Sequence, residues 1–500
     1  MLGVKMTKFS NVLFLFISYF TISATGKKPN VILILTDDQG YGDVNAHGHP
    51  YLKTPNINKF KSQSVSFENF YVSPSCSPTR AALLTGVHEF KNGVTHTINP
   101  RQQLHKSAIL FTELLKNNGY LNAFIGKWHL GNNPGPDKRG FDWCSTNVGG
   151  PNKHFDTMII RNRKRINTVG FREDAFFDEA IHFIKENKEN PFFCYLSTYS
   201  PHTPLGAPKH FIKPFKDAGL NDTHATYLAM IENIDYNLGR LMDFLEHSNL
   251  EKDTIVILIN DNGVTEGLDI FNANMRGSKC TAWEGGSRAF SFWHFPSKWK
   301  SKKVNNLTAH LDIFPTICEL TETSIPSQIK SKLDGYSLCP LLENPKPFIW
   351  NPDRILFHHV ARWPSGLAKD HKYSMASVRS GNHLLLRSHD CGKTECTKYS
   401  SQCQALRIIA KGGKNMTYAN GTAQFHWGVS PKDRWALFDV KKDPGCRNDL
   451  YERQPQLVSK LSSEYENWWE DIFPTMISKG GDLGDPNEAK RVAKKKKSEK

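Results

Sequence analysis

The 500-residue chain lacks several patterns that would assign it to common classes of protein. None of its ten cysteines has the doubled Cys-x-x-Cys spacing of a structural zinc site, which argues against a zinc-stabilised module. No basic segment is interleaved with aromatic residues, so we expect no nucleic acid partner. The sequence also contains no internal repeat and no long low-complexity linker. What remains is the composition of a globular protein whose length suggests two domains.

Long apolar segments are also scarce. The one at the N-terminus runs from Val12 to Ile22, follows Lys5 and Lys8, and precedes small residues at 24–26 of the kind that a signal peptidase reads. It is shorter than the ~20 residues that a membrane-spanning helix requires. We therefore interpret residues 1–26 as a cleaved secretory signal and expect no transmembrane segment. The mature protein is predicted to be secreted or periplasmic.

The formal net charge of +15 is unevenly distributed along the chain. Lys5 and Lys8 contribute two of these charges and the lysine-rich segment 490–500 contributes six, which leaves +7 for the body of the protein. This modest excess favours an anionic substrate through long-range attraction. The terminal lysines have no apolar neighbours, so we predict that residues 483–500 form a solvated basic tail.

Short apolar runs alternate with amphipathic segments over most of the chain. Four runs have the composition of buried parallel strands, at 30–36, 121–125, 192–198 and 254–260. Three segments have helical periodicity, at 107–118, 172–187 and 223–247. These patterns predict an α/β fold for residues 27–345, in which a large mixed, mostly parallel sheet is sandwiched by helices.

The pattern changes from about residue 348. Short predicted strands separated by polar turns follow, and a helix over 455–473 closes this part of the chain. We predict that residues 346–482 form a smaller α+β domain with an antiparallel sheet.

Polar side chains follow each of the four predicted parallel strands. They are Asp37 and Asp38, Lys127 and His129, His202, and Asp261 and Asn262. Because ligands bind beyond the carboxyl ends of parallel strands, we expect these groups to lie in one crevice. The acidic and amide side chains supply hard oxygen ligands that suit Ca²⁺, whereas Mg²⁺ demands a tighter geometry and is less favoured. Each pair alone is more typical of a solvated turn, and only their combination indicates a metal site.

The segment Cys76-Ser-Pro-Thr-Arg80 opens a further predicted helix. Pro78 suits an early helical position and Gly86 suits the end of the helix. A helix start offers unpaired backbone N–H groups, and the guanidinium of Arg80 presents a planar fork of donors that matches a tetrahedral oxyanion. We therefore expect an anionic group beside Cys76.

This segment resembles the Cys-x-Pro-x-Arg signature of the type I sulfatases, in the arylsulfatase A-like branch of the alkaline phosphatase-like superfamily. Six further segments resemble this family in the same order: Pro29 to Gly42, Gly126 to Gly131, Ile259 to Gly263, Arg276 to Gly286, His310 to Thr316 and Asp334 to Leu338. The resemblance covers most of residues 29–345 and implies the alkaline phosphatase-like fold.

In that family a maturation enzyme oxidises the signature cysteine to formylglycine, whose hydrated aldehyde supplies the attacking oxygen. The resemblance therefore implies that Cys76 is a formylglycine precursor and that such a maturation enzyme is a partner. It also implies that Asp261 accepts the proton of the attacking hydroxyl group. The implied metal ligands are Asp37, Asp38, residue 76, Asp261 and Asn262.

The resemblance also assigns roles to five basic side chains. Arg80, Lys127 and Lys279 are expected to hold and neutralise the oxygens of the sulfuryl group. His202 or Lys279 is expected to protonate the departing alcohol oxygen, and His129 is the expected base for the release of sulfate.

These patterns predict a secreted, calcium-dependent sulfatase that hydrolyses sulfate esters of a sulfated carbohydrate. A phosphate or phosphonate ester hydrolase of the same superfamily is an alternative, which turnover of nitrophenyl sulfate and nitrophenyl phosphate would distinguish. A non-catalytic polyanion-binding homologue is another, and it predicts an unmodified Cys76 and binding that persists after Cys76→Ala.

Overall fold

A computed structural model describes residues 27–343, 350–393, 403–410, 415–417, 423–425 and 429–484. The predicted signal segment and residues 485–500 of the predicted tail lie outside the described residues, as does the predicted domain boundary at 345/346. Among the described residues, no helix combines the length and apolar character needed to cross a bilayer. The division into domains stays a prediction.

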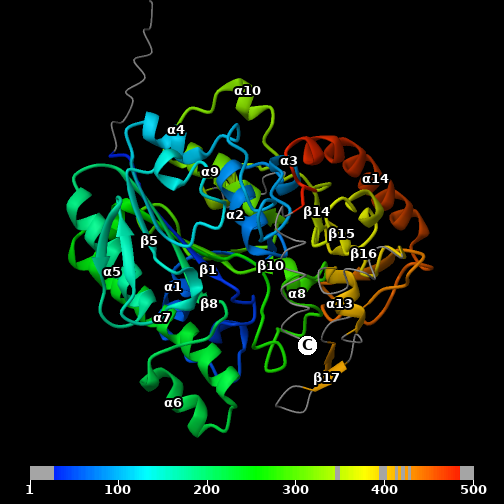
Figure 1. The fold of residues 1–500 in the computed structure, drawn as a ribbon, viewed down its shortest axis with the longest axis horizontal. Helices are drawn as coiled ribbons and strands as arrows, with labels where there is room; N and C mark the ends of the chain where they lie inside the picture. The colour runs from blue at the N-terminus through cyan, green and yellow to red at the C-terminus, as the bar shows by residue number, and fades with distance from the viewer. Residues whose placement is uncertain are drawn as a thin grey trace, which may run out of the picture.

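A ten-stranded mixed sheet forms the centre of the larger part of the molecule (Figure 1). Its strands, in spatial order, are β12 (Lys302–Val304), β2 (Val65–Phe67), β11 (Ser291–His294), β9 (Thr254–Asn260), β1 (Asn30–Asp37), β8 (Phe192–Pro201), β4 (Leu121–Gly126), β5 (Trp143–Asn147), β6 (Met158–Arg161) and β7 (Lys164–Asn167). The neighbours β9, β1, β8, β4 and β5 run parallel, whereas β11 and β6 pair antiparallel with both of their neighbours. The four predicted strands are thus confirmed at the centre of the sheet.

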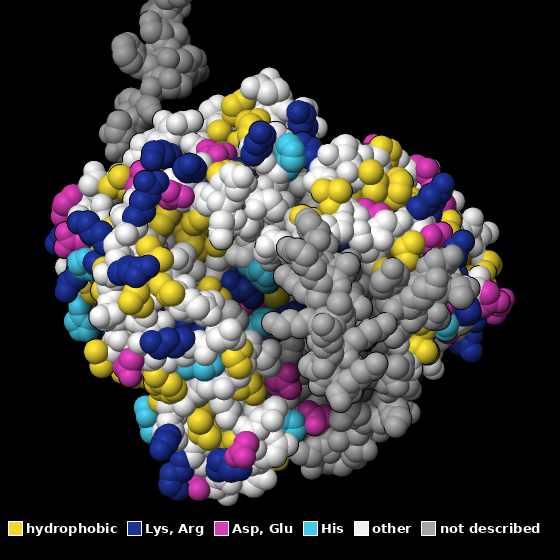
Figure 2. All heavy atoms as spheres, viewed as in Figure 1, with side chains coloured by type: hydrophobic (Ala, Val, Ile, Leu, Met, Phe, Trp, Pro, Cys, Tyr) yellow, Lys and Arg dark blue, Asp and Glu magenta, His cyan; other side chains and the backbone are white. Residues whose placement is uncertain are grey.

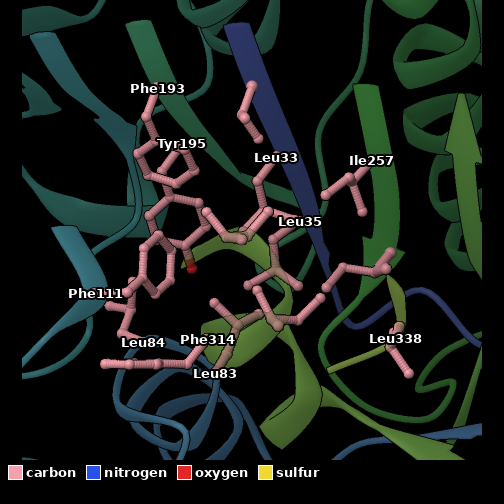
Figure 3. Close-up of a cluster of buried hydrophobic side chains, with 14 of the residues drawn as sticks. Leu33, Leu35, Leu83, Leu84, Phe111, Phe193, Tyr195, Ile257, Phe314 and Leu338 are labelled. Carbon is pink, nitrogen blue, oxygen red and sulfur yellow. The ribbon is translucent and has the colours of Figure 1, made fainter. Parts of the chain in front are cut away.

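Helices cover both faces of this sheet because its central strands are apolar on both sides. Leu33 and Leu35 of β1 pack with Leu83, Phe111 and Phe314 on one face (Figure 3). The alternate residues of β1 pack on the opposite face against two long helices. Helices of the first face are α2 (Cys76–Thr85), α4 (Phe111–Asn117) and α9 (Ile313–Leu320), and those of the second are α1 (Pro55–Ser62), α5 (Arg172–Asn187) and α7 (Asp222–His247).

Three predicted helices differ little from the observed ones, and one starts later. The helices predicted at 172–187 and 223–247 are α5 and α7. The helix predicted from residue 107 begins only at Phe111, because the Glu113 carboxylate accepts a hydrogen bond from the Leu110 N–H and caps the helix there. The signature segment opens α2, which ends at Gly86 with a positive φ of 66°.

An antiparallel four-stranded sheet lies beside the larger sheet and confirms the second predicted architecture. Its order is β14 (Ile355–His359), β15 (Ala376–Ser380), β16 (His383–Arg387) and β19 (Ala436–Asp439). Helix α14 (Pro455–Ser478) packs on it through Leu461, Tyr465 and Trp469. This helix extends beyond the predicted end at residue 473 because Met476, one turn past Ile472, is buried in the same cluster.

Two buried ion pairs join the antiparallel sheet to the larger part. Arg354 contacts Asp312 at 2.7 Å, and Arg379 contacts Glu284 at 3.2 Å. The remaining described helices are α3 (Glu89–Asn92), α6 (Lys209–Asp217), α8 (Glu284–Ser287), α10 (Ser327–Lys330), α11 (Cys339–Glu343) and α13 (Gln404–Ala410). The remaining strands are β3 (Phe70–Tyr71), β10 (Arg288–Ala289), β13 (Thr308–Ala309), β17 (Asn415–Thr417) and β18 (Ala423–Phe425).

Candidate active site

The carboxyl ends of four parallel strands deliver polar side chains to one place. Asp37 is the last residue of β1, and its Oδ2 accepts a hydrogen bond from Lys127 Nζ, just beyond β4, at 2.5 Å. His202, just beyond β8, lies with Nε2 3.7 Å from Asp38 Oδ2. Asp261, just beyond β9, accepts at Oδ1 from the Asp38 N–H at 3.1 Å. The crevice expected from the strand ends is therefore present.

Cys76 lies at the start of α2 against this acidic group. Its Sγ is fully buried and lies 3.7 Å from Asp38 Oδ1. Four potential ligand atoms, one each from Asp37, Asp38, Cys76 and His202, all lie within 4.8 Å of one another. The structure thus places His202 in the tightest group, whereas Asp261 adjoins it through its hydrogen bond with the Asp38 backbone.

Two buried oxygens at this point have no hydrogen-bond partner: Asp37 Oδ1 and Asn262 Oδ1. The side-chain amide of Asn262 donates to Asp38 Oδ1 at 2.9 Å, so Asn262 also adjoins the acidic group. Buried oxygens without partners are costly unless something satisfies them. This donor set, made mainly of carboxylate and amide oxygens, fits a hard divalent cation.

Three cations of the site are paired with its carboxylates. Lys127 pairs with Asp37 at 2.5 Å and Lys279 pairs with Asp38 at 2.5 Å. The fully buried Arg80 contacts Asp261 at 2.7 Å and also donates to the Lys127 carbonyl and to Ser197 Oγ. Because none of these side chains is more than slightly exposed, their interactions are weakly screened by water.

This arrangement shifts the pKa values of the carboxyl groups in opposite directions. Burial acts to raise the pKa of Asp37, but Lys127, His202 and Arg80 outweigh it and hold that pKa well below its usual value. Burial, aided by the Asp37 carboxylate, raises the pKa of Asp261 to about 7 despite Arg80.

The thiol of Cys76 is shifted as well. Burial raises its pKa well above the ordinary value, although Lys127 and Lys279 act in the opposite direction. An unmodified Cys76 is therefore a neutral thiol at pH 7, which is a weaker nucleophile than a thiolate.

A glycine is required immediately before Lys127. Gly126 has a φ of 101°, and a Cβ at this position would lie 1.9 Å from the Ser197 carbonyl oxygen. The neighbouring Lys127 N–H donates to the same oxygen at 2.8 Å. The close approach of β4 and β8 therefore fixes the start of the segment that carries Lys127 and His129.

We expect Gly126→Ala to lower the free energy of unfolding by about 2 kcal/mol or more and to impair hydrolysis, because it adds a backbone clash to the positive-φ strain. Urea denaturation measures the first effect. Gly119→Ala is the matched control, since Gly119 has a φ of 84° but nothing within 4 Å of the added Cβ. Equal losses for the two variants would show that the clash is unimportant.

A pocket of about 330 Å³ opens onto the site. Five of the predicted residues line it, namely Cys76, Lys127, His129, His202 and Lys279, together with Thr97, Tyr199 and Arg362. On the face shown in Figure 2, Lys or Arg and His side chains are visible in a hollow near the middle of the molecule. His129 Nε2 donates a hydrogen bond to the Thr97 carbonyl at 3.0 Å, while its Nδ1 is buried without a hydrogen-bond partner.

Sequence reasoning missed Thr97 and Arg362. Arg362 follows β14 in the C-terminal part, where no local motif distinguishes it, and its Nη2 donates to Thr97 Oγ1 at 3.0 Å. Tyr199 lies in the segment after the strand run at 192–198. Its position close to His202 in the sequence was the only indication that it lines the pocket. Three further histidines, to which the sequence assigned no role, lie outside this pocket. His294 pairs with Glu251, and His358 and His359 are buried elsewhere.

Comparisons with known proteins agree with this geometry. The sequence model of the family described as Sulfatase matches residues 29–323. The chain is 27% identical to arylsulfatase J of Mus musculus over 88% of its own length and 75% of the relative. It is 30% identical to N-acetylgalactosamine-6-sulfatase of Homo sapiens over 64% of its own length and 67% of the relative.

Solved structures are similar in fold. The crystal structure of Ps i-CgsB in complex with k-i-k-neocarrahexaose superposes with a TM-score of 0.74 and 25% identity, covering 93% of this chain and 96% of that one. The fold, the signature helix and the family match lead to one conclusion. This chain belongs to the sulfatase family, and it is a sulfuric ester hydrolase of that family.

Proposed function

We propose that this protein is a secreted, calcium-dependent sulfatase that removes sulfate from a sulfated carbohydrate through a formylglycine made from Cys76. The observation that carries the proposal is the position of Cys76, which lies 3.7 Å from Asp38 in a pocket bordered by Lys127 and Lys279. A nucleophile at this place would face both the oxygen ligands of a cation and the cations that neutralise a sulfate. The names of two relatives, an N-acetylgalactosamine-6-sulfatase and a neocarrahexaose-bound protein, favour a glycan.

Asp37, Asp38, Asp261 and Asn262 would hold the cation, with an oxygen of the matured residue 76. The two unpartnered oxygens of Asp37 and Asn262 support this assignment. A calcium ion, when bound, neutralises charge on the sulfuryl oxygens. The formylglycine, when present, supplies the oxygen that attacks sulfur.

The remaining roles belong to side chains already in place. Lys127, Lys279 and Arg80 bind and orient the sulfuryl oxygens through charge-assisted hydrogen bonds. His202 lies at the mouth of the pocket with its side chain 23% exposed, so it can reach the leaving oxygen, to which it or Lys279 donates a proton. The unpartnered Nδ1 of His129 supports its role as a base in sulfate release.

Mass spectrometry of the peptide that contains residues 76–80 tests the nucleophile. The protein should be produced in its native host or with a formylglycine-generating enzyme. We expect the mass decrease that accompanies replacement of a thiol by an aldehyde, together with release of sulfate from nitrophenyl sulfate or a sulfated oligosaccharide. An unmodified peptide in a preparation that still hydrolyses sulfate esters would contradict the proposed nucleophile, and preferential turnover of nitrophenyl phosphate would contradict the proposed substrate.

Removal of the cation gives a second test. Dialysis against a chelator should abolish turnover and lower the melting temperature, because a ligand at about 100 times its Kd stabilises the folded state by about 2.7 kcal/mol. Added Ca²⁺ should restore both properties better than Mg²⁺. Asn262→Ala should reduce the Ca²⁺-dependent shift in melting temperature. A shift of the same size in this variant would exclude Asn262 as a ligand.

A further inference from the structure

We propose that Arg362 selects substrates that carry a second anionic group, a sulfate or a carboxylate, beside the sulfate ester to be cleaved. This inference rests on the proposed function, since it concerns the substrate of the same site. It is carried by the charge balance of the pocket and by the place of Arg362 between two cavities.

Arg362 differs from the other cations that line the pocket. Lys127 and Lys279 each lie 2.5 Å from a carboxylate, whereas Arg362 forms no ion pair with any carboxylate among the described residues. Among the described residues, its guanidinium donates one hydrogen bond, from Nη2 to Thr97 Oγ1, and its Nε is buried without a hydrogen-bond partner. A guanidinium with most of its donors unused at the edge of a polar pocket is suited to bind an anion.

Arg362 also lines a second cavity of about 590 Å³ that adjoins the first. The two cavities share His202, Lys279 and Arg362, so a chain of sugars whose sulfate ester lies at Cys76 can continue past Arg362 into the second cavity. Gln404 and Arg407 of α13 line its far side. Arg407 forms only a 3.5 Å hydrogen bond, with Gln404 Oε1, and adds a second cation without a carboxylate partner among the described residues.

The acidic groups of this cavity offset these charges only in part. Asp269 pairs with His224 at 3.0 Å, and Asp38 is engaged by Lys279. Glu266 is the other acidic residue of the lining. The wall formed by Arg362 and Arg407 is therefore the cationic side of the cavity, and a glycan with one sulfate in the first pocket would place its next anionic group against it.

Three kinds of oligosaccharide, prepared from N-acetylgalactosamine glycans and from carrageenan, separate the sources of the second charge. One carries a single sulfate, one carries an additional sulfate, and one carries a single sulfate and a uronate carboxylate. For Arg362→Gln we expect KM to rise about 10- to 100-fold for at least one of the two doubly charged oligosaccharides, while kcat stays nearly unchanged. For the singly sulfated oligosaccharide, both KM and kcat should stay nearly unchanged. The oligosaccharide whose KM rises shows whether the second anionic group is a sulfate or a carboxylate. Arg362→Lys should recover part of the loss.

Arg434→Gln is the matched control. Arg434 belongs to the same C-terminal part, pairs with Asp449 at 2.9 Å and lines neither cavity, so its removal changes the net charge equally without touching the wall. The inference would be overturned if Arg362→Gln raised KM equally for all three kinds of oligosaccharide, or if it raised KM for none of them. A loss for Arg434→Gln as large as that for Arg362→Gln would overturn it too, because net charge alone would then explain the effect.

Binding separates this inference from the proposed function. In the Cys76→Ala background, which cannot turn over substrate, calorimetry with the same oligosaccharides should give a Kd about 10- to 100-fold weaker when Arg362 is replaced by Gln, for the doubly charged kinds alone. This result would support the role of Arg362 even if the protein released no sulfate. An unchanged Kd for every kind would overturn the inference even if the protein proved to be an active sulfatase.

Discussion

Replacement of Cys76 by alanine is expected to lower kcat by about 10⁴-fold or more, because it removes the proposed nucleophile. The cost in stability should be only about 1 kcal/mol, since a single buried sulfur is lost. Measured release of sulfate gives the first quantity, and urea denaturation gives the second. Binding of a sulfated oligosaccharide should persist, because Lys127, Lys279 and Arg80 remain in place.

Cys194→Ala is the matched control for this experiment. Cys194 is equally buried, near the start of β8, but it lies outside the pocket. Its replacement should therefore lower stability to a similar extent and leave hydrolysis nearly unchanged. Retention of more than about one hundredth of the activity by Cys76→Ala would be incompatible with a nucleophile at this position.

Replacement of Arg80 by methionine is expected to lower the free energy of unfolding by about 3–5 kcal/mol at about pH 9, where the Asp261 carboxyl group, whose pKa is about 7, is ionised and would lose its cation. Hydrolysis should be lost as well, since the variant lacks the proposed donor to the sulfuryl oxygens. Urea denaturation in the presence of a chelator measures the stability without a contribution from a bound cation.

A double-mutant cycle identifies the origin of this loss. Asp261→Leu in the Arg80→Met background should restore part of the stability, because the uncompensated carboxylate is then absent. Arg240→Met serves as the control, since Arg240 pairs with Asp178 near the surface and should contribute at most about 1 kcal/mol. If Arg80→Met were no more harmful than Arg240→Met, the buried ion pair would not be a major contribution to stability.

Local patterns predicted the centre of the fold well. The run at 30–36 was predicted correctly as a buried strand, because its short, continuous apolar composition is typical of a strand that is covered on both faces, and β1 is. The start of α4 was predicted less well, since a capping carboxylate at Glu113 overrides the apolar periodicity that begins at residue 107. The end of α14 depends on the packing of Met476 against a sheet that the periodicity of the helix cannot reveal.

Residues of the candidate site could be predicted where they follow strands or lie in a recognised motif, and not where they come from elsewhere. Asp37, Asp261 and His202 are recognisable because strand ends in a parallel sheet converge, and Cys76 because of its signature. Thr97 and Arg362, in contrast, meet across 265 residues of sequence, and neither lies in a pattern that indicates the contact. Long-range contacts of this kind are set by how the antiparallel sheet docks, which no single segment encodes.

The two arginine–carboxylate pairs at the junction, Arg354 with Asp312 and Arg379 with Glu284, have a mechanical consequence. Each charge is buried, so sliding one part over the other would strip a charge of its partner without exposing it to water. We expect this junction to resist shear, so that the loop bearing Arg362 keeps a fixed spacing from the signature helix. This fixed spacing would favour glycans whose two anionic groups are separated by the matching distance.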